Sequence, residues 1–141
     1  MAALPTKLLL EIVTPDKSIV REEVDEVELP GSEGYLGVLP GHTPLLTMLK
    51  VGELWYRAGA EKHYLAVAFG FAEVLPDRVT ILAQVAERAQ DIDIERAEAA
   101  KRRAEERLAT RGPDMDFERA RIAMMKSLIR LQVASRARTR V

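Results

Sequence analysis

The most constraining feature of this sequence is a change of character near Glu87. Before that residue, short runs rich in Val, Ile, Leu and aromatic residues are separated by Pro, Gly and Asp; after it, Ala, Arg and Glu dominate. Strands and helices need apolar residues at different periods, so a chain that changes in this way contains two structurally different parts. We therefore predict the α+β class, with an N-terminal domain over residues 1–86 and a C-terminal domain over residues 87–141.

The first part contains apolar runs of strand type. They are KLLLEIV, EVDEVEL, YLGVL, VGELWYR, HYLAVAFGFAEV and RVTILAQV. The segments between them, such as TPDK, PGSEG, LPGHTP, RAGAEK and LPDR, supply Pro to fix φ and Gly or Asp for tight turns. Because no helical period of useful length interrupts these runs, we predict an antiparallel β-sandwich of two packed sheets.

The second part predicts an antiparallel hairpin of two helices. In the RGPDMD segment, Gly112 can end the first helix, Pro113 cannot continue it, and Asp114 or Asp116 can cap the second. A short loop and narrow, alanine-rich stripes place the two helices close together and bury little apolar area, so we expect the hairpin to pack against the first domain or a partner. The predicted stripes are Ile94, Ala97, Ala100, Ala104 and Leu108 in the first helix, and Phe117, Ala120, Met124, Leu128, Leu131 and Ala134 in the second.

The two parts differ in charge. Residues 1–85 hold 7 Lys and Arg against 12 Asp and Glu, whereas residues 86–141 hold 14 against 10, so a net charge of −5 is followed by one of +4. The chain has no cysteine, which excludes disulfides and thiol chemistry, and His42 and His63 lack metal-ligand spacing. We predict no metal site and no catalytic residues.

The N-terminal segment and the overall hydropathy bear on location. The run MAALPTKLLLEIVTP is interrupted by Glu11 and is followed by no small-residue cleavage site, so we expect no signal peptide. No segment approaches the ~20 apolar residues that span a bilayer. Any membrane association is therefore expected to be peripheral and made through a partner.

One segment carries a specific motif. PGSEGYLGVLPGHTPLLTMLKVGEL follows the pattern GxLGxxPGHxPLL and resembles the signature of the epsilon subunit of F-type ATP synthases, called delta in mitochondria. The resemblance runs from EIVTPD through LPDRVTILAQVAERAQDID to the last helix, and it implies a β-sandwich followed by a helical hairpin. The motif residues are Gly34, Leu36, Gly37, Pro40, Gly41, His42, Pro44, Leu45 and Leu46.

This resemblance implies a non-catalytic subunit of the rotating central stalk of a proton-translocating ATP synthase. In that family the sandwich binds the gamma subunit and rests on the c-ring, and so couples rotation to ATP synthesis by the alpha and beta subunits. The hairpin inhibits ATP hydrolysis when its basic residues meet acidic segments of beta. The absence of a transit peptide favours a bacterial protein over a nuclear-encoded organelle protein, with a plastid-encoded gene as the alternative, and we expect a peripheral protein on the cytoplasmic face of a bacterial cell membrane.

The resemblance also implies contact residues for the c-ring. The family's loops around the SEGxLG and PGH segments face that ring, which makes Ser32, Glu33, Tyr35 and His42 the candidate contacts. Many relatives carry an acid at the position of Tyr35, so Glu33 is the nearest substitute for an ionic contact. A lone histidine beside Pro and Gly is more often a turn residue, and His42 also has this interpretation.

The segment DIDIERA, residues 91–97, has two interpretations. As a helix start, Asp91 or Asp93 caps the helix, Glu95 favours the positive end of its dipole, and Asp93 pairs with Arg96. Some bacterial members of the family bind ATP through I/L-D-x-x-R-A, so the resemblance implies a regulatory ATP that joins the two helices, with no cofactor required. Lysine in place of arginine at position 126 predicts a weaker site. The candidate ATP contacts are Glu87, Ile92, Asp93, Arg96, Ala97, Arg103, Lys126 and Arg130.

Two other classes of function are alternatives to this interpretation. The basic tail ending RLQVASRARTRV could be a nucleic-acid or ribosome-binding arm, but Arg and Glu alternate in the first helix and stacking aromatics are scarce. A small independent enzyme is disfavoured because no Ser, Cys or His constellation supports nucleophilic catalysis.

Overall fold

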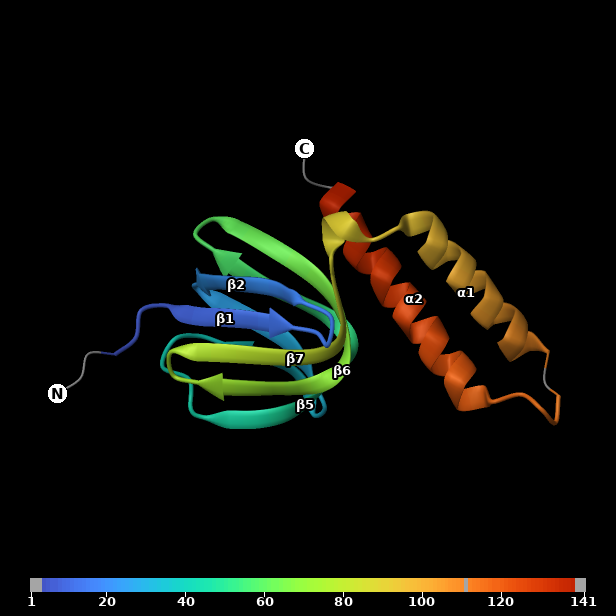
Figure 1. Cartoon of the computed structure of the whole chain (residues 1–141), viewed down its shortest axis with the longest axis horizontal. Helices are drawn as coiled ribbons and strands as arrows, with labels where there is room; N and C mark the ends of the chain where they lie inside the picture. Colours follow the sequence, from blue (N-terminus) through green and yellow to red (C-terminus); the bar gives the residue numbers. More distant parts are fainter. Residues whose placement is uncertain (1–3, 111, 139–141) are drawn as a thin grey trace. The chain divides into compact units, whose positions relative to one another are not determined.

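The computed structural model describes residues 4–110 and 112–138. The chain divides into two compact units between Arg88 and Ala89. The first unit contains the strands and the second the helices, as the α+β prediction requires (Figure 1). Arg111 of the expected interhelical loop, the first three residues of the N-terminal segment and residues 139–141 of the basic tail lie outside the described residues.

The first unit is one continuous hydrogen-bonded sheet. Its strand order is β2-β1-β7-β6-β5-β3-β4. Neighbouring strands are antiparallel, with the exception of the parallel pair β1 and β7. The strands are β1 (Leu8–Val13), β2 (Ser18–Val24), β3 (Glu26–Gly31), β4 (Gly34–Val38), β5 (Leu45–Ala58), β6 (Glu61–Leu75) and β7 (Arg78–Arg88).

The sheet folds over to enclose a core, which confirms the predicted sandwich. Strands β2 and β5 are far apart in the strand order and nevertheless contact each other. Apolar side chains from the whole sheet, such as Leu10, Val24, Leu54 and Ile81, are fully buried in one cluster. The two layers are therefore parts of one folded sheet, and the parallel pair β1–β7 departs from the purely antiparallel expectation.

Strand β6 departs from regular strand geometry at Phe69 and Gly70, whose φ angles are 58° and 122°. A Cβ atom on Gly70 would lie 2.0 Å from the carbonyl oxygen of Leu82 in β7. Glycine is therefore required for both the backbone angle and the close approach of the two strands.

Two strand boundaries differ from the prediction. The run EVDEVEL is divided at Asp25 between the end of β2 and the start of β3, and β5 begins at Leu45, six residues before the predicted VGELWYR. Strand β2 lies at an edge of the sheet and exposes Arg21, Glu22 and Glu23, so its apolar signal is weak.

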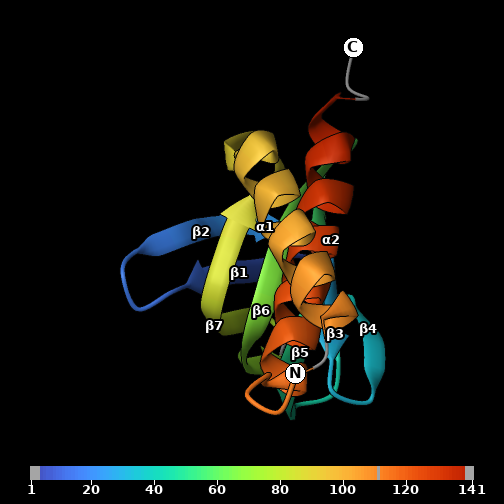
Figure 2. The same ribbon diagram turned by 90° about the vertical axis from the view of Figure 1, so that its right-hand side faces the viewer.

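The second unit is an antiparallel helical hairpin, as predicted (Figure 2). A short 3₁₀ turn, η1 (Ala89–Asp91), precedes α1 (Ile94–Ala109) and α2 (Phe117–Arg138). Asp93 caps α1 by accepting from the backbone N–H of Arg96 at 3.1 Å. Asp116 caps α2 in the same way. None of the described helices is long and apolar enough to span a membrane.

The predicted stripe of α2 was wrong at several positions. Phe117 and Leu128 are 45% and 46% exposed, whereas Val133 is buried. Apart from Val133, the buried residues of the two helices are small and recur at intervals of seven, and small side chains allow two helices to approach closely. These residues are Ala97 and Ala104 in α1, and Ala120, Ser127 and Ala134 in α2.

Candidate functional sites

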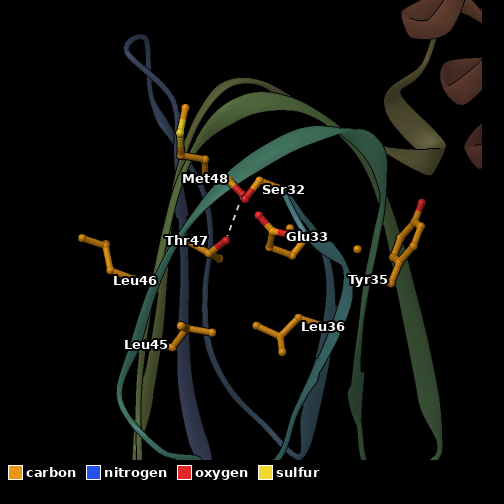
Figure 3. A pocket seen from close by; sticks show the side chains of 10 residues that line it. Ser32, Glu33, Tyr35, Leu36, Leu45, Leu46, Thr47 and Met48 are labelled. Atoms are coloured by element: carbon orange, nitrogen blue, oxygen red, sulfur yellow. Dashed lines mark hydrogen bonds between the residues drawn. The ribbon is translucent and has the colours of Figure 1, made fainter.

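The β3–β4 turn and the first half of β5 line an open hollow of about 620 Å³ (Figure 3). The backbone N–H of Ser32 donates to the carbonyl oxygen of Met48 at 2.8 Å, which fixes the turn to β5. Glu33 is exposed at this turn, and its carboxylate is available to a partner. Tyr35 is also exposed, and its hydroxyl accepts from the backbone N–H of Glu53 at 3.3 Å. The structure therefore places Ser32 and Glu33 on the β3–β4 turn and Tyr35 just after it, on strand β4.

His42 lies in the segment between β4 and β5. Its Nδ1 atom is 2.6 Å from the carbonyl oxygen of Thr43, and its backbone N–H donates to Leu39. Gly41, with φ of 87°, donates its N–H to the carbonyl oxygen of Pro76 at 2.7 Å, which ties this loop to the β6–β7 turn. His42 thus has the contacts of a turn residue, and no metal-binding cluster occurs among the residues that the structure describes.

A row of exposed apolar side chains crosses one face of the sheet. Met48 on β5 lies opposite Phe71 on β6, and Phe71 lies opposite Leu82 on β7. These side chains are 58%, 50% and 54% exposed. Val13 on β1, which is half-buried, is the partner of Leu82 and extends the row. We call Val13, Met48, Phe71 and Leu82 the apolar row, and an exposed row of this kind is typical of a protein-binding surface.

Sequence reasoning missed the apolar row, although a signal was present. In β6, the segment that contains Phe71 and Ala72 is apolar at consecutive positions, so both faces of the strand carry apolar side chains. A strand with one solvated face alternates apolar and polar residues. The missing alternation could have indicated that a partner covers the second face.

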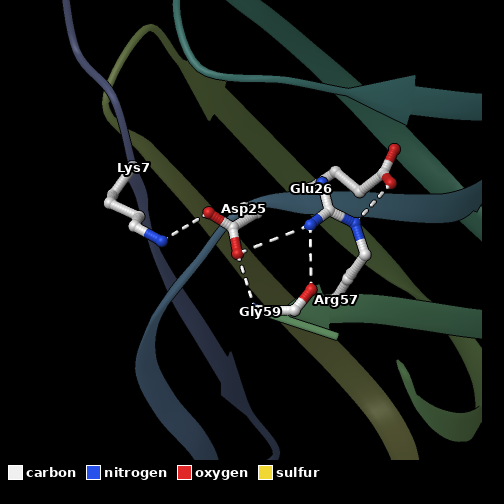
Figure 4. Close-up of polar contacts among 5 residues, drawn as sticks. All are labelled: Lys7, Asp25, Glu26, Arg57 and Gly59. Atoms are coloured by element: carbon white, nitrogen blue, oxygen red, sulfur yellow. Dashed lines mark hydrogen bonds and ion pairs between the residues drawn. The ribbon is translucent and has the colours of Figure 1, made fainter. Parts of the chain in front are cut away.

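A polar cluster ties together the start of β1, the β2–β3 corner and the β5–β6 turn (Figure 4). Asp25 accepts from Lys7 Nζ and from the backbone N–H of Gly59, and the bond from Lys7, followed by that from Gly59, holds the pKa of Asp25 below its ordinary value. Arg57 donates to Glu26 at 2.9 Å and to the carbonyl oxygen of Gly59 at 3.0 Å. The groups satisfy one another, so we assign this cluster a structural role.

The residues of the ATP motif lie where α1 begins. Ile92 and Ala97 are buried, and the Asp93 carboxylate is engaged in the helix cap. In the described part of the chain, the side chains of Asp93 and Arg96 form no ion pair, so the expected i,i+3 pair was wrong. Glu87 lies on β7 in the first unit, whereas the other candidate contacts belong to the second.

The exposed face of α1 carries a series of arginines. Arg96, Arg103 and Arg107 follow one another at intervals of seven and four residues, which places them on one side of the helix. All three are exposed, and within the described residues none of them forms an ion pair. Lys126 and Arg130 are one turn apart on α2. Arg96, Arg103 and Arg107, which we call the arginine face, can therefore meet phosphate or carboxylate groups.

Two family models match most of the chain. The model described as "ATP synthase, Delta/Epsilon chain, beta-sandwich domain" matches residues 7–89, and "ATP synthase, Delta/Epsilon chain, long alpha-helix domain" matches residues 90–135.

Similar proteins cover nearly the whole length. The ATP synthase epsilon chain of Nitratidesulfovibrio vulgaris (strain DP4) is 51% identical over 130 residues, which covers 92% of this chain and 97% of the relative. That of Koribacter versatilis (strain Ellin345) is 58% identical over 100 residues, or 71% of this chain and 70% of the relative. A chain in the cryo-EM structure of the Euglena gracilis mitochondrial ATP synthase, OSCP/F1/c-ring, matches with a TM-score of 0.72 and 23% identity, covering 97% of this chain and 82% of that one, and so shares the fold.

Proposed function

This chain belongs to the family of delta and epsilon chains of ATP synthases, and is thus a subunit serving ATP synthesis; we propose that it acts as a non-catalytic rotor subunit of the central stalk. In this proposal the first unit binds the gamma subunit and rests on the c-ring, and so transmits rotation to the catalytic head. The complex holds the subunit at the cytoplasmic face of a bacterial cell membrane. Family membership also decides against the alternative of a nucleic-acid or ribosome-binding arm.

The observation that carries the docking proposal is the apolar row. Met48, Phe71 and Leu82 leave about half of their side-chain surface exposed, and burial of that half against a partner would contribute roughly 1 kcal/mol for each side chain. Their neighbours along the row belong to paired strands, so the surface is rigid before binding. A rigid surface loses little conformational entropy on association, as a subunit that carries torque requires.

We assign the ionic part of the c-ring contact to Glu33. The Tyr35 hydroxyl accepts from the backbone of β5 and the His42 ring is bonded within its own loop, so these two side chains shape the surface. Ser32 holds the turn through its backbone. Glu33 alone among the four candidates has an exposed carboxylate that can meet a basic loop of the ring.

The arginine face of α1 supports an inhibitory role for the second unit. Its uncompensated charges would attract acidic segments of the catalytic beta subunits, and contact with those segments would block rotation in the hydrolysis direction. Exposed pairs contribute only ~0 to 1 kcal/mol each, so the contact would be reversible and open to regulation.

The same face favours ATP as a regulatory ligand. Arg96 and Arg103 could donate to phosphate oxygens while Lys126 and Arg130 approach from α2, so that one nucleotide joins the two helices. Bound ATP would stabilise the compact hairpin by ~2.7 kcal/mol at a hundredfold excess over its dissociation constant. ATP and the acidic segments of beta would then compete for Arg96 and Arg103.

The docking proposal is tested by a charge placed in the apolar row. Leu82→Glu should weaken binding to the purified gamma subunit at least tenfold in calorimetry, because the new carboxylate would be desolvated in the interface. Ala60→Glu is the matched control, since it adds the same charge at the exposed β5–β6 turn and should bind like the parent. Equal affinity of Leu82→Glu and the parent would show that the row is not the gamma surface.

The ATP proposal is tested by calorimetric titration of the full chain. We expect saturable binding that Arg96→Ala and Arg103→Ala each abolish. Arg102→Ala, which removes an exposed arginine beside the proposed contacts, should bind like the parent. If the folded parent gives no heat up to millimolar ATP, DIDIERA is only a helix start.

A further inference from the structure

Arg88 is the last residue of β7 and of the first unit. Its guanidinium donates to the carbonyl oxygen of Ile19 in β2 at 2.9 Å and to the hydroxyl of Tyr56 in β5 at 3.4 Å. Tyr56 in turn donates to the carboxylate of Glu22 in β2 at 2.8 Å, and the ring of His63 stacks on Tyr56 at 4.9 Å between centroids. One side chain thus connects three strands at the end of β7.

These bonds cross the sheet between strands that are not neighbours. Strand β1 separates β2 from β7, and β6 separates β5 from β7, so β7 has no ladder bonds to the strands that Arg88 reaches. Tyr56 is fully buried, and hydrogen bonds to charged groups gain strength where water is excluded. Burial, followed by the bond to Glu22, raises the pKa of Tyr56, so its hydroxyl remains a donor at neutral pH. The connection is therefore long-range and partly buried.

The hydrogen bonding of β7 to the rest of the sheet ends at Arg88. The ladder between β6 and β7 finishes with the pair Leu65 and Arg88. The next residues form η1, which contacts α2 and belongs to the second unit. Regular helix resumes only at Ile94, after the Asp93 cap. The chain therefore passes from a fixed strand end to the second unit within a few residues.

We infer that Arg88 is a clamp that fixes the end of β7 and confines any hinge motion of the helical hairpin to the junction between Arg88 and η1. Without the clamp, a pull on the hairpin would separate β7 from β6 residue by residue, beginning at Arg88 and moving toward Leu82 in the apolar row. With it, the same pull must break the bonds to Ile19 and Tyr56 together. The hairpin can then change conformation while the apolar row, the proposed gamma-binding surface, stays intact. The clamp itself is inferred from the contacts of Arg88, and only the regulatory use of the hairpin motion rests on the proposed function.

Amide hydrogen exchange of the full chain, followed by mass spectrometry, tests the clamp. In Arg88→Ala, exchange should rise at least tenfold in residues 84–88 and in the paired end of β6, residues 65–67, with no change in β1 and β3. Arg88→Lys should give an intermediate rise, because an ammonium group lacks the planar fork that reaches two acceptors. Arg78→Ala is the matched control, since Arg78 is exposed at the other end of β7 and its side chain has no hydrogen bond or ion pair among the described residues.

Two results would overturn the inference. Unchanged exchange in residues 84–88 of Arg88→Ala would mean that Arg88 does not stabilise the end of β7. An equal rise of exchange in every strand would mean that Arg88 stabilises the whole first unit instead of this strand end. If Arg88→Ala does not fold, the pattern of Arg88→Lys decides by the same criteria. The measurement needs no other subunit, so its outcome is independent of whether gamma binding is found.

Discussion

Replacement of Gly70 by alanine should destabilise the first unit strongly. The φ of Gly70 is +122°, and the added Cβ would lie 2.0 Å from the carbonyl oxygen of Leu82 and 2.9 Å from the Cα of Ala83. Ordinary contact begins at 3.4 Å, so β6 and β7 would have to separate by roughly 1.4 Å in the middle of the sheet. The backbone angle costs ~1–3 kcal/mol for a residue with a Cβ, and each lost ladder bond costs ~1 kcal/mol. We expect a loss of at least ~3 kcal/mol and a fall in Tm of ~12 °C or more.

The assay is thermal and urea denaturation, followed by circular dichroism and by the fluorescence of Trp55, the single tryptophan. Gly37→Ala is the control, because a Cβ at Gly37 meets no atom within 4 Å and its φ is not in the left-handed region. That variant should unfold like the parent. A Tm of Gly70→Ala within ~2 °C of the parent would refute the argument that close strand approach requires this glycine.

Other predictions concern a helix cap and two titrating groups. Asp93→Ala should cost ~1 kcal/mol of helix stability and speed amide exchange at Arg96, without affecting the first unit. The pKa of Asp25 is lowered, chiefly by Lys7, so its contribution is present above about pH 4 and is lost as pH falls through its folded-state pKa. Asp25→Asn should therefore be less stable than the parent at pH 7, and the difference in the free energy of unfolding should disappear below about pH 4 when both are followed by acid titration. The pKa of Tyr56 is raised, so the parent should lose stability relative to Tyr56→Phe as pH rises above about 10, measured by urea denaturation.

The strands were predictable where one face is buried and the other solvated. Alternation fails in β2, an edge strand whose Arg21, Glu22 and Glu23 are exposed, and so the run EVDEVEL merged the end of β2 with β3. The parallel pairing of β1 with β7 leaves no local mark, because the two strands are far apart in the sequence and only the folding of the sheet brings them together.

The helices were predictable in number and in their N-caps but not in their packing; the expected end of the first helix at Gly112 was wrong, because α1 ends at Ala109 with Thr110 as its C-cap. A search for apolar periodicity selects large residues such as Phe117 and Leu128, which are exposed, whereas the buried residues of α2 include the small Ala120, Ser127 and Ala134. Helix α2 has apolar residues on several sides, so the large ones do not single out one face. Small residues carry little hydropathy signal even when close approach depends on them.

The candidate sites likewise divide into those that the sequence could indicate and those that only the structure shows. The residues of the signature and of DIDIERA could be named as candidates from the sequence because each motif is contiguous. The apolar row combines four strands, and Arg88 binds groups 32 and 69 residues away. Sites assembled by the sheet therefore required the structure, and their partners remain proposals.

The rotor role is tested most directly by ATP-driven proton pumping in vesicles that contain the reconstituted synthase with and without this chain. We expect that the complex lacking the chain hydrolyses ATP without pumping, that the parent chain restores pumping, and that Leu82→Glu does not. Equal pumping in the presence and absence of the chain would contradict its assignment as the subunit that couples c-ring rotation to the catalytic head.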